Sequence, residues 1–219
     1  DGSAWQALGS GGQNGVNSGV RALAVSGSDV YVGGFFTEAG GQPANFVARW
    51  DGGAWQALES GGQNGMNSSV LALAVLGSDV YVGGFFSQAG GQPANRVARW
   101  DGSAWQVLGS GGQNGVNGPV NALAVSGSDV YVGGAFTEAG GQPANFVARW
   151  DGDGWASLGS GDENGVNSGV RALATADQVL HVGGVFGQAG CEVSSSIATF
   201  VGDPDLIFRS NFDGNVCLE

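Results

Sequence analysis

Gly-Ser-Asp-Val-Tyr-Val-Gly-Gly-Phe-Phe, residues 27–36, is the stretch that decides the fold of this 219-residue chain. It returns at 77–86, at 127–136 with Ala135 in place of phenylalanine, and in degraded form at 177–186. The spacing is 50 residues each time. A fixed period of this length is the sequence signature of a repeat protein whose units stack side by side. We therefore predict one domain of four repeats over residues 1–202, followed by a tail.

Composition and charge narrow the class of protein. The 44 glycines follow no Gly-X-Y triplet and lie between apolar runs, which indicates tight turns in an all-β protein. The formal net charge is −12, so the surface is acidic and favours solubility. Nucleic acid is therefore not an expected partner, and anionic membrane surfaces are disfavoured. Membrane insertion is not expected either, because no apolar run approaches the roughly 20 residues that a spanning helix needs.

Each repeat contains four short segments with strand character, rich in β-branched and aromatic residues and bounded by glycine. In the first repeat they are residues 4–8, 20–25, 30–36 and 46–50. Two connections are short turns, and the other two are longer, at 9–19 and 37–45. Neighbouring antiparallel strands alternate in direction, so both long loops are predicted to lie at one end of each sheet. This long-loop face is where we expect function, because loops carry most binding residues.

The repeats resemble kelch repeats of β-propellers, in which four strands form one blade. Gly33-Gly34 ends a strand, Trp55 follows at kelch-like spacing, and the later copies repeat this. They are also similar to the kelch-like repeats of fungal cortical cell-polarity marker proteins and of bacterial surface proteins. Those share the pattern Val-Tyr-Val-Gly-Gly-x-Phe … Ala-Asn-x-Val-Ala-Arg-Trp-Asp-Gly … Trp. The resemblance covers residues 1–202 and implies a propeller, but little about chemistry, because propellers host many functions.

The two ends of the repeat region are predicted to complete one another. The chain begins with outer-strand residues, 4–8, and the last repeat ends with a strand at 195–200 that lacks an outer neighbour. Pairing them would close a four-bladed β-propeller with four antiparallel strands per blade and cover exposed strand edges. Small residues in the inner strand, such as Ala22 and Ala24, suit a narrow ring. This monomer is favoured over an eight-bladed ring of two chains, each lending its first strand to the other.

Both cysteines, Cys191 and Cys217, lie where the repeat breaks down. A disulfide that fastens the tail, 203–219, to the last repeat is predicted, with two free thiols as the alternative. It would suit an oxidising compartment, so we expect a secreted or cell-surface protein. The tail is interpreted as a cap, or else the remnant of a secretion or anchoring segment. A start in mid-repeat at Asp1 is expected for a mature or trimmed form, and a cloning scar is one interpretation of the last two residues.

Groups for catalysis or metal binding are scarce. His181 is the single histidine and replaces a strand tyrosine, so it is interpreted as a packing residue. An enzyme is therefore not expected, and no cofactor is predicted, because a catalytic triad needs a base on a cleft. The segment 162–167, Asp-Glu-Asn-Gly-Val-Asn, offers oxygen ligands of the kind that Ca²⁺ prefers. It lacks a complete ligand spacing, so a solvated loop is the preferred interpretation and no metal site is predicted.

The seven tryptophans flank Asp-Gly turns: Trp5, Trp55, Trp105 and Trp155 begin strands, and Trp50, Trp100 and Trp150 end them. This placement predicts cross-strand aromatic pairs rather than platforms for sugars. Arg49 and its copies Arg99 and Arg149 lie next to them, and are expected to stack on a ring or to pair with turn acids such as Asp29.

Positions that vary between nearly identical repeats are the candidate ligand-binding residues, with neutral drift as the alternative. One set is Arg21, Leu71, Asn121 and Arg171; another is Phe46, Arg96, Phe146 and Ser196; Asn17, Gln42 and Asn45 lie nearby on the long-loop face. We predict a non-catalytic binding or scaffold propeller that contacts a protein partner with this face. The alternative is a multivalent carbohydrate-binding propeller, since repeated loops offer several equivalent sites.

Overall fold

The computed structural model describes residues 4–9, 14–109, 111–159 and 164–201. Within these ranges the chain consists of β-strands and loops, with one short 3-10 helix, η1 (Gly111–Gln113). No helix among the described residues is both long enough and apolar enough to cross a membrane.

Four antiparallel sheets follow one another along the chain, each built from inside to outside. The first contains β1 (Val20–Ser26), β2 (Asp29–Gly34), β5 (Val47–Trp50) and β6 (Trp55–Ala57). The second contains β9 (Val70–Leu76), β10 (Asp79–Gly84), β13 (Val97–Trp100) and β14 (Trp105–Val107). The third contains β15 (Val120–Ser126), β16 (Asp129–Gly134), β19 (Val147–Trp150) and β20 (Trp155–Ser157). The fourth, as described, contains β21 (Val170–Ala176), β22 (Val179–Gly184) and β25 (Ile197–Val201).

The long loops contain short hairpins of their own. These are β3 (Glu38–Ala39) with β4 (Gln42–Pro43), β7 (Glu59–Ser60) with β8 (Gln63–Asn64), β11 (Gln88–Ala89) with β12 (Gln92–Pro93), β17 (Glu138–Ala139) with β18 (Gln142–Pro143), and β23 (Gln188–Ala189) with β24 (Glu192–Val193). In the first sheet the two long loops are joined by a bridge between Val16 and Ala39, and the other sheets repeat it. The prediction that both long loops share one face is therefore confirmed.

The hydrophobic core lies between successive sheets. Tyr31 and Val47 of the first sheet pack in one cluster with Val70, Val80 and Val82 of the second. Equivalent clusters join the second sheet to the third and the third to the fourth. In the second and third sheets, β10 and β16 present alternate side chains to the two neighbouring sheets, which explains why both faces of these strands are apolar.

A glycine at the end of the second strand allows neighbouring sheets to approach. A Cβ on Gly33 would lie 2.4 Å from Cγ1 of Val70 in the next sheet. Gly83 has the same relation to Val120, at 2.4 Å, and Gly133 to Val170, at 2.5 Å. The first glycine of the Gly-Gly pair in each of the first three sheets is therefore required by packing between sheets.

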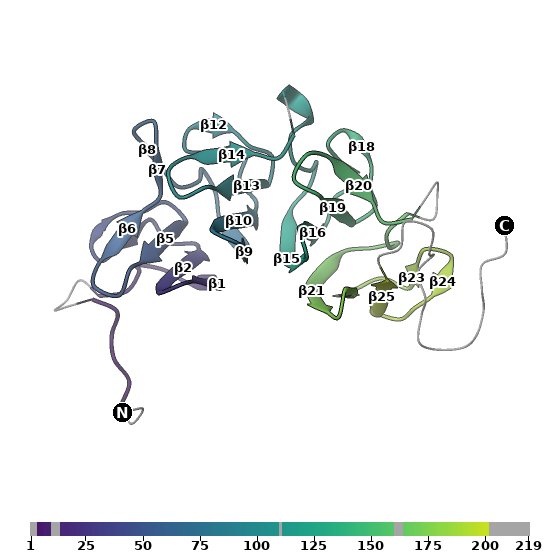
Figure 1. The fold of residues 1–219 in the computed structure, drawn as a ribbon, viewed down its shortest axis with the longest axis horizontal. Coiled ribbons are helices and arrows are strands. Elements are labelled where there is room, and N and C mark those ends of the chain that lie inside the picture. The colour runs from purple at the N-terminus through teal and green to yellow at the C-terminus, as the bar shows by residue number, and fades with distance from the viewer. Residues whose placement is uncertain (1–3, 10–13, 110, 160–163, 202–219) are drawn as a thin grey trace.

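The predicted closure of a four-bladed ring is wrong in this structure. Residues 4–8 form no strand, and β25 has no outer neighbour among the described residues. Figure 1 shows an open arc with β1, β9, β15 and β21 along its concave side, and with β1 and β25 at opposite ends. The apolar cluster that joins the first two sheets includes Ala24 of β1 together with Leu73 and Val75 of β9, so apolar side chains fill the space between these two sheets at their inner edge. The packing of such clusters sets the angle from one sheet to the next, and over four sheets this angle leaves the two ends of the arc apart.

Candidate ligand-binding surface

The long-loop face is held by a repeated asparagine clamp. Oδ1 of Asn17 accepts hydrogen bonds from the backbone amides of Thr37 at 2.9 Å and Glu38 at 3.1 Å, and its Nδ2 donates to Oγ1 of Thr37 at 3.1 Å. Its copies Asn67, Asn117 and Asn167 each accept the same two amide hydrogen bonds. The predicted ligand residue Asn17 is therefore committed to tying the two long loops together.

A second asparagine joins neighbouring repeats. The backbone amide of Asn45 donates to Oδ1 of Asn64 at 2.9 Å, and its Nδ2 donates to the Asn64 carbonyl at 3.3 Å. Asn95 makes both bonds to Asn114 in the next repeat. The side chain of Asn45, another predicted ligand residue, thus fixes one loop against the next.

The residue that follows this position, which is asparagine in the first three repeats and Ser195 in the fourth, has left-handed backbone geometry in every repeat. The φ angles are 66° at Phe46, 66° at Arg96, 64° at Phe146 and 68° at Ser196, in a region that non-glycine residues adopt rarely. Phe46 and Phe146 pack against the core clusters between sheets. Nη1 of Arg96 donates to the Phe86 carbonyl at 3.0 Å. These half-buried side chains do not form one exposed surface.

Arg96 also borders a hollow between the second and third sheets. The hollow has a volume of about 250 Å³, and Asn117 and Glu138 line it as well. Nε of Arg96 is buried without a hydrogen-bond partner. Gln42 lines a larger cavity, of about 660 Å³, between the N-terminal segment and the pair Trp50 and Trp55.

The variable position in the inner strand is used differently in each repeat. Arg21 is exposed, and its guanidinium carbon lies 4.9 Å from the centre of the Phe35 ring, within the range of a cation–π contact. Leu71 is half-buried, and Nδ2 of Asn121 donates to the Val170 carbonyl of the next sheet at 2.8 Å. Arg171 is exposed. Of this set, the two arginines are the most accessible to a partner.

The sequence interpretation missed three exposed apolar residues, one in each of three repeats, of which Phe35 lies against Arg21. Phe35 is 40%, Phe85 47% and Val185 55% exposed, and each follows a Gly-Gly pair on the long-loop face. The backbone amide of Phe35 donates to the Gly19 carbonyl at 2.9 Å, which places it next to the start of β1. We call these three residues, with Arg21 and Arg171, the inner rim. Alternation in the expected strand 30–36 could have given the signal, although the observed strand β2 ends at Gly34; Phe36 is fully buried and Phe35 is exposed.

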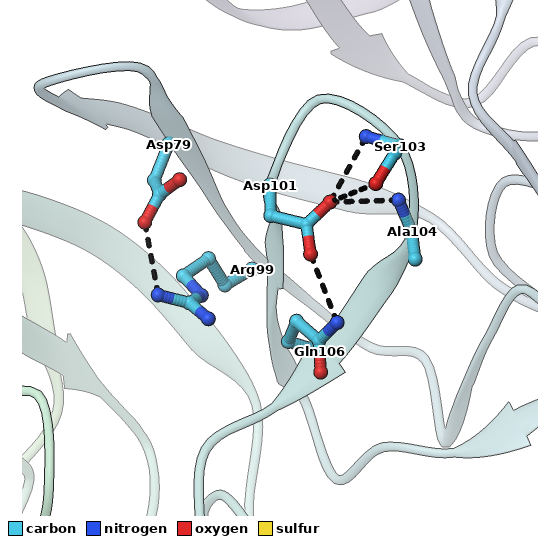
Figure 2. A network of polar contacts seen from close by, with 6 residues as sticks. All are labelled: Asp79, Arg99, Asp101, Ser103, Ala104 and Gln106. Carbon is cyan, nitrogen blue, oxygen red and sulfur yellow. Dashed lines mark hydrogen bonds and ion pairs between the residues drawn. The ribbon is translucent and has the colours of Figure 1, made fainter.

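The acidic side chains of the short turns at the opposite end serve structural roles. Oδ1 of Asp101 accepts hydrogen bonds from the amides of Ser103 and Ala104, and Nε2 of Gln106 donates to Oδ2 at 2.9 Å (Figure 2). The backbone bonds from Ala104 and Ser103 hold the pKa of Asp101 well below its usual range. Arg99 pairs with Asp79 at 2.9 Å in the same view.

The predicted ion pairs and tryptophan pairs are confirmed. Arg49 pairs with Asp29 at 3.3 Å, and Arg149 pairs with Asp129 at 3.2 Å. Ring centres lie 5.5 Å apart for Trp50 and Trp55, 5.2 Å for Trp100 and Trp105, and 5.4 Å for Trp150 and Trp155. Trp100 and Trp105 are buried, so this pair offers no open ring face for a sugar.

Other predicted features lie partly outside the described residues. No group of three or more His, Cys, Asp or Glu side chains that could hold a metal occurs in the described part of the chain. The acids of the oxygen-rich loop, residues 162 and 163, lie outside the described residues.

His181 is half-buried in β22, where the other repeats have a buried tyrosine. No described cysteine is free, but Cys217 and the tail are not described, so the disulfide stays a prediction.

Comparisons with known proteins agree with a propeller-like repeat fold. A family model described as a β-propeller domain of unknown function, DUF5122, matches residues 129–154. The computationally designed protein Ika4 is similar in structure, with a TM-score of 0.54 and 21% identity over 91% of this chain and 100% of Ika4. The designed protein Ika8 has a TM-score of 0.49 and 20% identity over 90% of this chain and 62% of its own, so the chain spans less than two thirds of Ika8. No curated protein shows significant similarity.

The strand order, the β-propeller family description and the likeness to Ika4 together define an all-β, propeller-like repeat protein. At this level of identity the likeness concerns the fold alone. Function must therefore be argued from the surface of this chain.

Proposed function

We propose that this chain is a non-catalytic binding or scaffold module that contacts a protein partner with its inner rim. The observation that carries the proposal is the exposure of Phe35, Phe85 and Val185 on the long-loop face. Apolar side chains grouped among polar ones mark protein interaction sites, and aromatic and arginine side chains supply most of the binding energy at such sites. Arg21, which lies over Phe35, adds the second of these residue types.

The asparagine clamps support the proposal because they fix the loops before any partner arrives. The loops that present the rim are tied by side-chain hydrogen bonds of 2.9–3.1 Å in repeat after repeat. A surface that is already ordered loses less conformational entropy on binding.

Two further proposals accompany this one. The repeats are kelch-like, which the packing role of Gly33 supports, and the protein is secreted or cell-surface, which the predicted disulfide supports.

The experiment is selection of a displayed random-peptide library on the immobilised chain. We expect enriched peptides that lose at least tenfold in affinity with Phe85→Ser, because the exposed ring would contribute directly to the contact. Val107→Ser, an exposed apolar residue on the outer strand β14, is the matched control and should leave binding unchanged.

A glycan array with the same variants tests the carbohydrate alternative. A glycan that binds, without peptide enrichment, would replace the proposal by multivalent sugar recognition. Peptides that bind Phe85→Ser as well as the unsubstituted chain would remove the inner rim from the interaction.

A further inference from the structure

The first sheet exposes a face that is buried in the later sheets. This leading face consists of Val20, Leu23 and Val25, of which Leu23 is 64% exposed. The equivalent of Leu23 in the third sheet, Leu123, is only 9% exposed, because it packs against the second sheet. The leading face therefore has the composition of an interface between sheets, yet none of the sheets in the described part of the chain packs against it.

The fourth sheet exposes the opposite face. This trailing face contains Gly183 and Ile197, and Ile197 is 63% exposed, whereas its equivalent Val147 is 0% exposed. A Cβ on Gly183 would meet its nearest atom, the Cβ of Ala172 in the same sheet, at 3.8 Å. Gly133, in contrast, has the Val170 side chain of the next sheet seated on it. The surface over Gly183 is therefore open and shaped to receive a valine such as Val20.

The N-terminal segment is placed as though a sheet preceded the first one. The Trp55 indole donates to the Leu8 carbonyl at 2.9 Å, and the amide of Gly15 donates to the same oxygen at 2.8 Å. Trp105 makes the equivalent bond to Leu58, which directly follows the outer strand β6. Residues 5–7, Trp-Gln-Ala, have the same sequence as β6, and Figure 1 shows this segment leaving the arc beyond the first sheet.

We propose that two copies of this chain join head to tail into a closed eight-bladed ring. The leading face of each copy packs on the trailing face of the other, with Val20 seated on Gly183. Residues 5–7 of each copy pair with β25 of the other, following the register in which Trp55 pairs with Trp50 and Ala57 with Ala48. The second copy is the occupant because repetition makes the two end faces complementary, as the internal joints already are.

The number of copies follows from closure. A head-to-tail contact forms a ring where the rotation closes and a filament where it does not. One open arc of four sheets cannot cover its own ends, whereas two arcs give eight blades, the upper end of the usual range for propellers. Three arcs would exceed that range. Closure also removes the unpaired edge of β25.

Solution mass with Gly183→Ala is the central test. The unsubstituted chain is expected at twice the 21.8 kDa of one chain by light scattering. Gly183→Ala has room for its Cβ in a single arc, so it should fold normally, with an unchanged circular dichroism spectrum, yet dimerise at least tenfold more weakly. Gly187→Ala, where nothing lies within 4 Å of the added Cβ, is the control and should remain a dimer.

Hydrogen exchange and mixed variants separate this ring from other assemblies. Amides of residues 5–7 should be protected in the dimer and exchange rapidly in Gly183→Ala. Leu23→Asp and Ile197→Asp should each be monomeric, and a mixture of the two should recover a weak dimer through its one intact joint. A monomeric or larger unsubstituted species, or a dimer that Gly183→Ala leaves unchanged, would overturn the proposal.

Discussion

Single residues on the long-loop face show how position decides the role of a polar side chain. Asn17 and Arg21 lie in the same strand-entry segment and face the same end of the sheet. Asn17 is occupied by three hydrogen bonds within the fold, whereas Arg21 remains exposed over an aromatic ring. The acceptor of Asn17 is therefore used within the fold, whereas the guanidinium of Arg21 is exposed to a partner.

The clamp makes a prediction at the residue scale. Asn67→Ala removes the acceptor for the amides of Ser87 and Gln88, so we expect a loss of about 1 kcal/mol in the free energy of unfolding in urea. Hydrogen exchange at those two amides should accelerate. Asn67→Asp keeps the acceptor and should lose less; equal losses for both substitutions would contradict the clamp.

The turn carboxylates predict a pH dependence. The pKa of Asp101 is lowered in the folded state from the ordinary value of 3.8, so its contribution to stability is present above that value. This contribution is lost as the pH falls from 3.8 toward the folded pKa, because protonation then favours the unfolded chain. Thermal melts below pH 4 should show a smaller decrease in Tm for Asp101→Asn than for the unsubstituted chain. Parallel curves would count against the hydrogen-bonded turn.

Among the structural elements, the outer hairpin is held mainly by its tryptophans. Trp105 packs against Trp100 across the turn, and its indole donates to the Leu58 carbonyl at 3.1 Å, which ties the outer strand to the loop before it. The aromatic pair and the indole hydrogen bond together explain why a strand of only three residues, β14, is ordered.

Two substitutions at Trp105 separate these contributions. Trp105→Ala should destabilise the protein by about 3–5 kcal/mol, the usual loss for a buried aromatic side chain. Trp105→Phe keeps a ring against Trp100 but removes the donor to Leu58, so a further loss of about 1 kcal/mol above the size change is expected. Urea unfolding followed by circular dichroism measures both. A Trp105→Phe variant as unstable as Trp105→Ala would show that the indole hydrogen bond dominates.

At the scale of the whole molecule, stability depends on the joints between sheets. Each joint combines an apolar cluster with a glycine that meets a valine of the next sheet. The same geometry sets the turn from one sheet to the next, and so the open shape of the arc in Figure 1.

A single methyl group at a joint should therefore be costly. Gly83→Ala places a Cβ 2.4 Å from Cγ1 of Val120, and we expect a loss of about 1–3 kcal/mol, as for other overpacked cores. Gly187→Ala adds the same group in open space and should change stability by less than about 0.5 kcal/mol. Thermal and urea unfolding of the pair measure the difference, and equal stabilities would mean that the joint can relax.

The sequence by itself determined the repeat, the strand order within a sheet, the shared face of the long loops, and the tryptophan and Arg–Asp pairs. These features follow from local periodicity and from contacts within one 50-residue unit, which the sequence displays directly. The sequence did not reveal that the side chains of Asn17 and Asn45 hold loops together. An asparagine in a sequence looks identical whether its side chain bonds to a loop of the same protein or to a ligand. Only the tertiary structure decided that the arc stays open and that Phe35 is exposed beside Arg21. Both depend on three-dimensional packing, because the angle between sheets is set by the clusters that join different repeats, and the Arg21–Phe35 contact joins residues that are not neighbours along the chain.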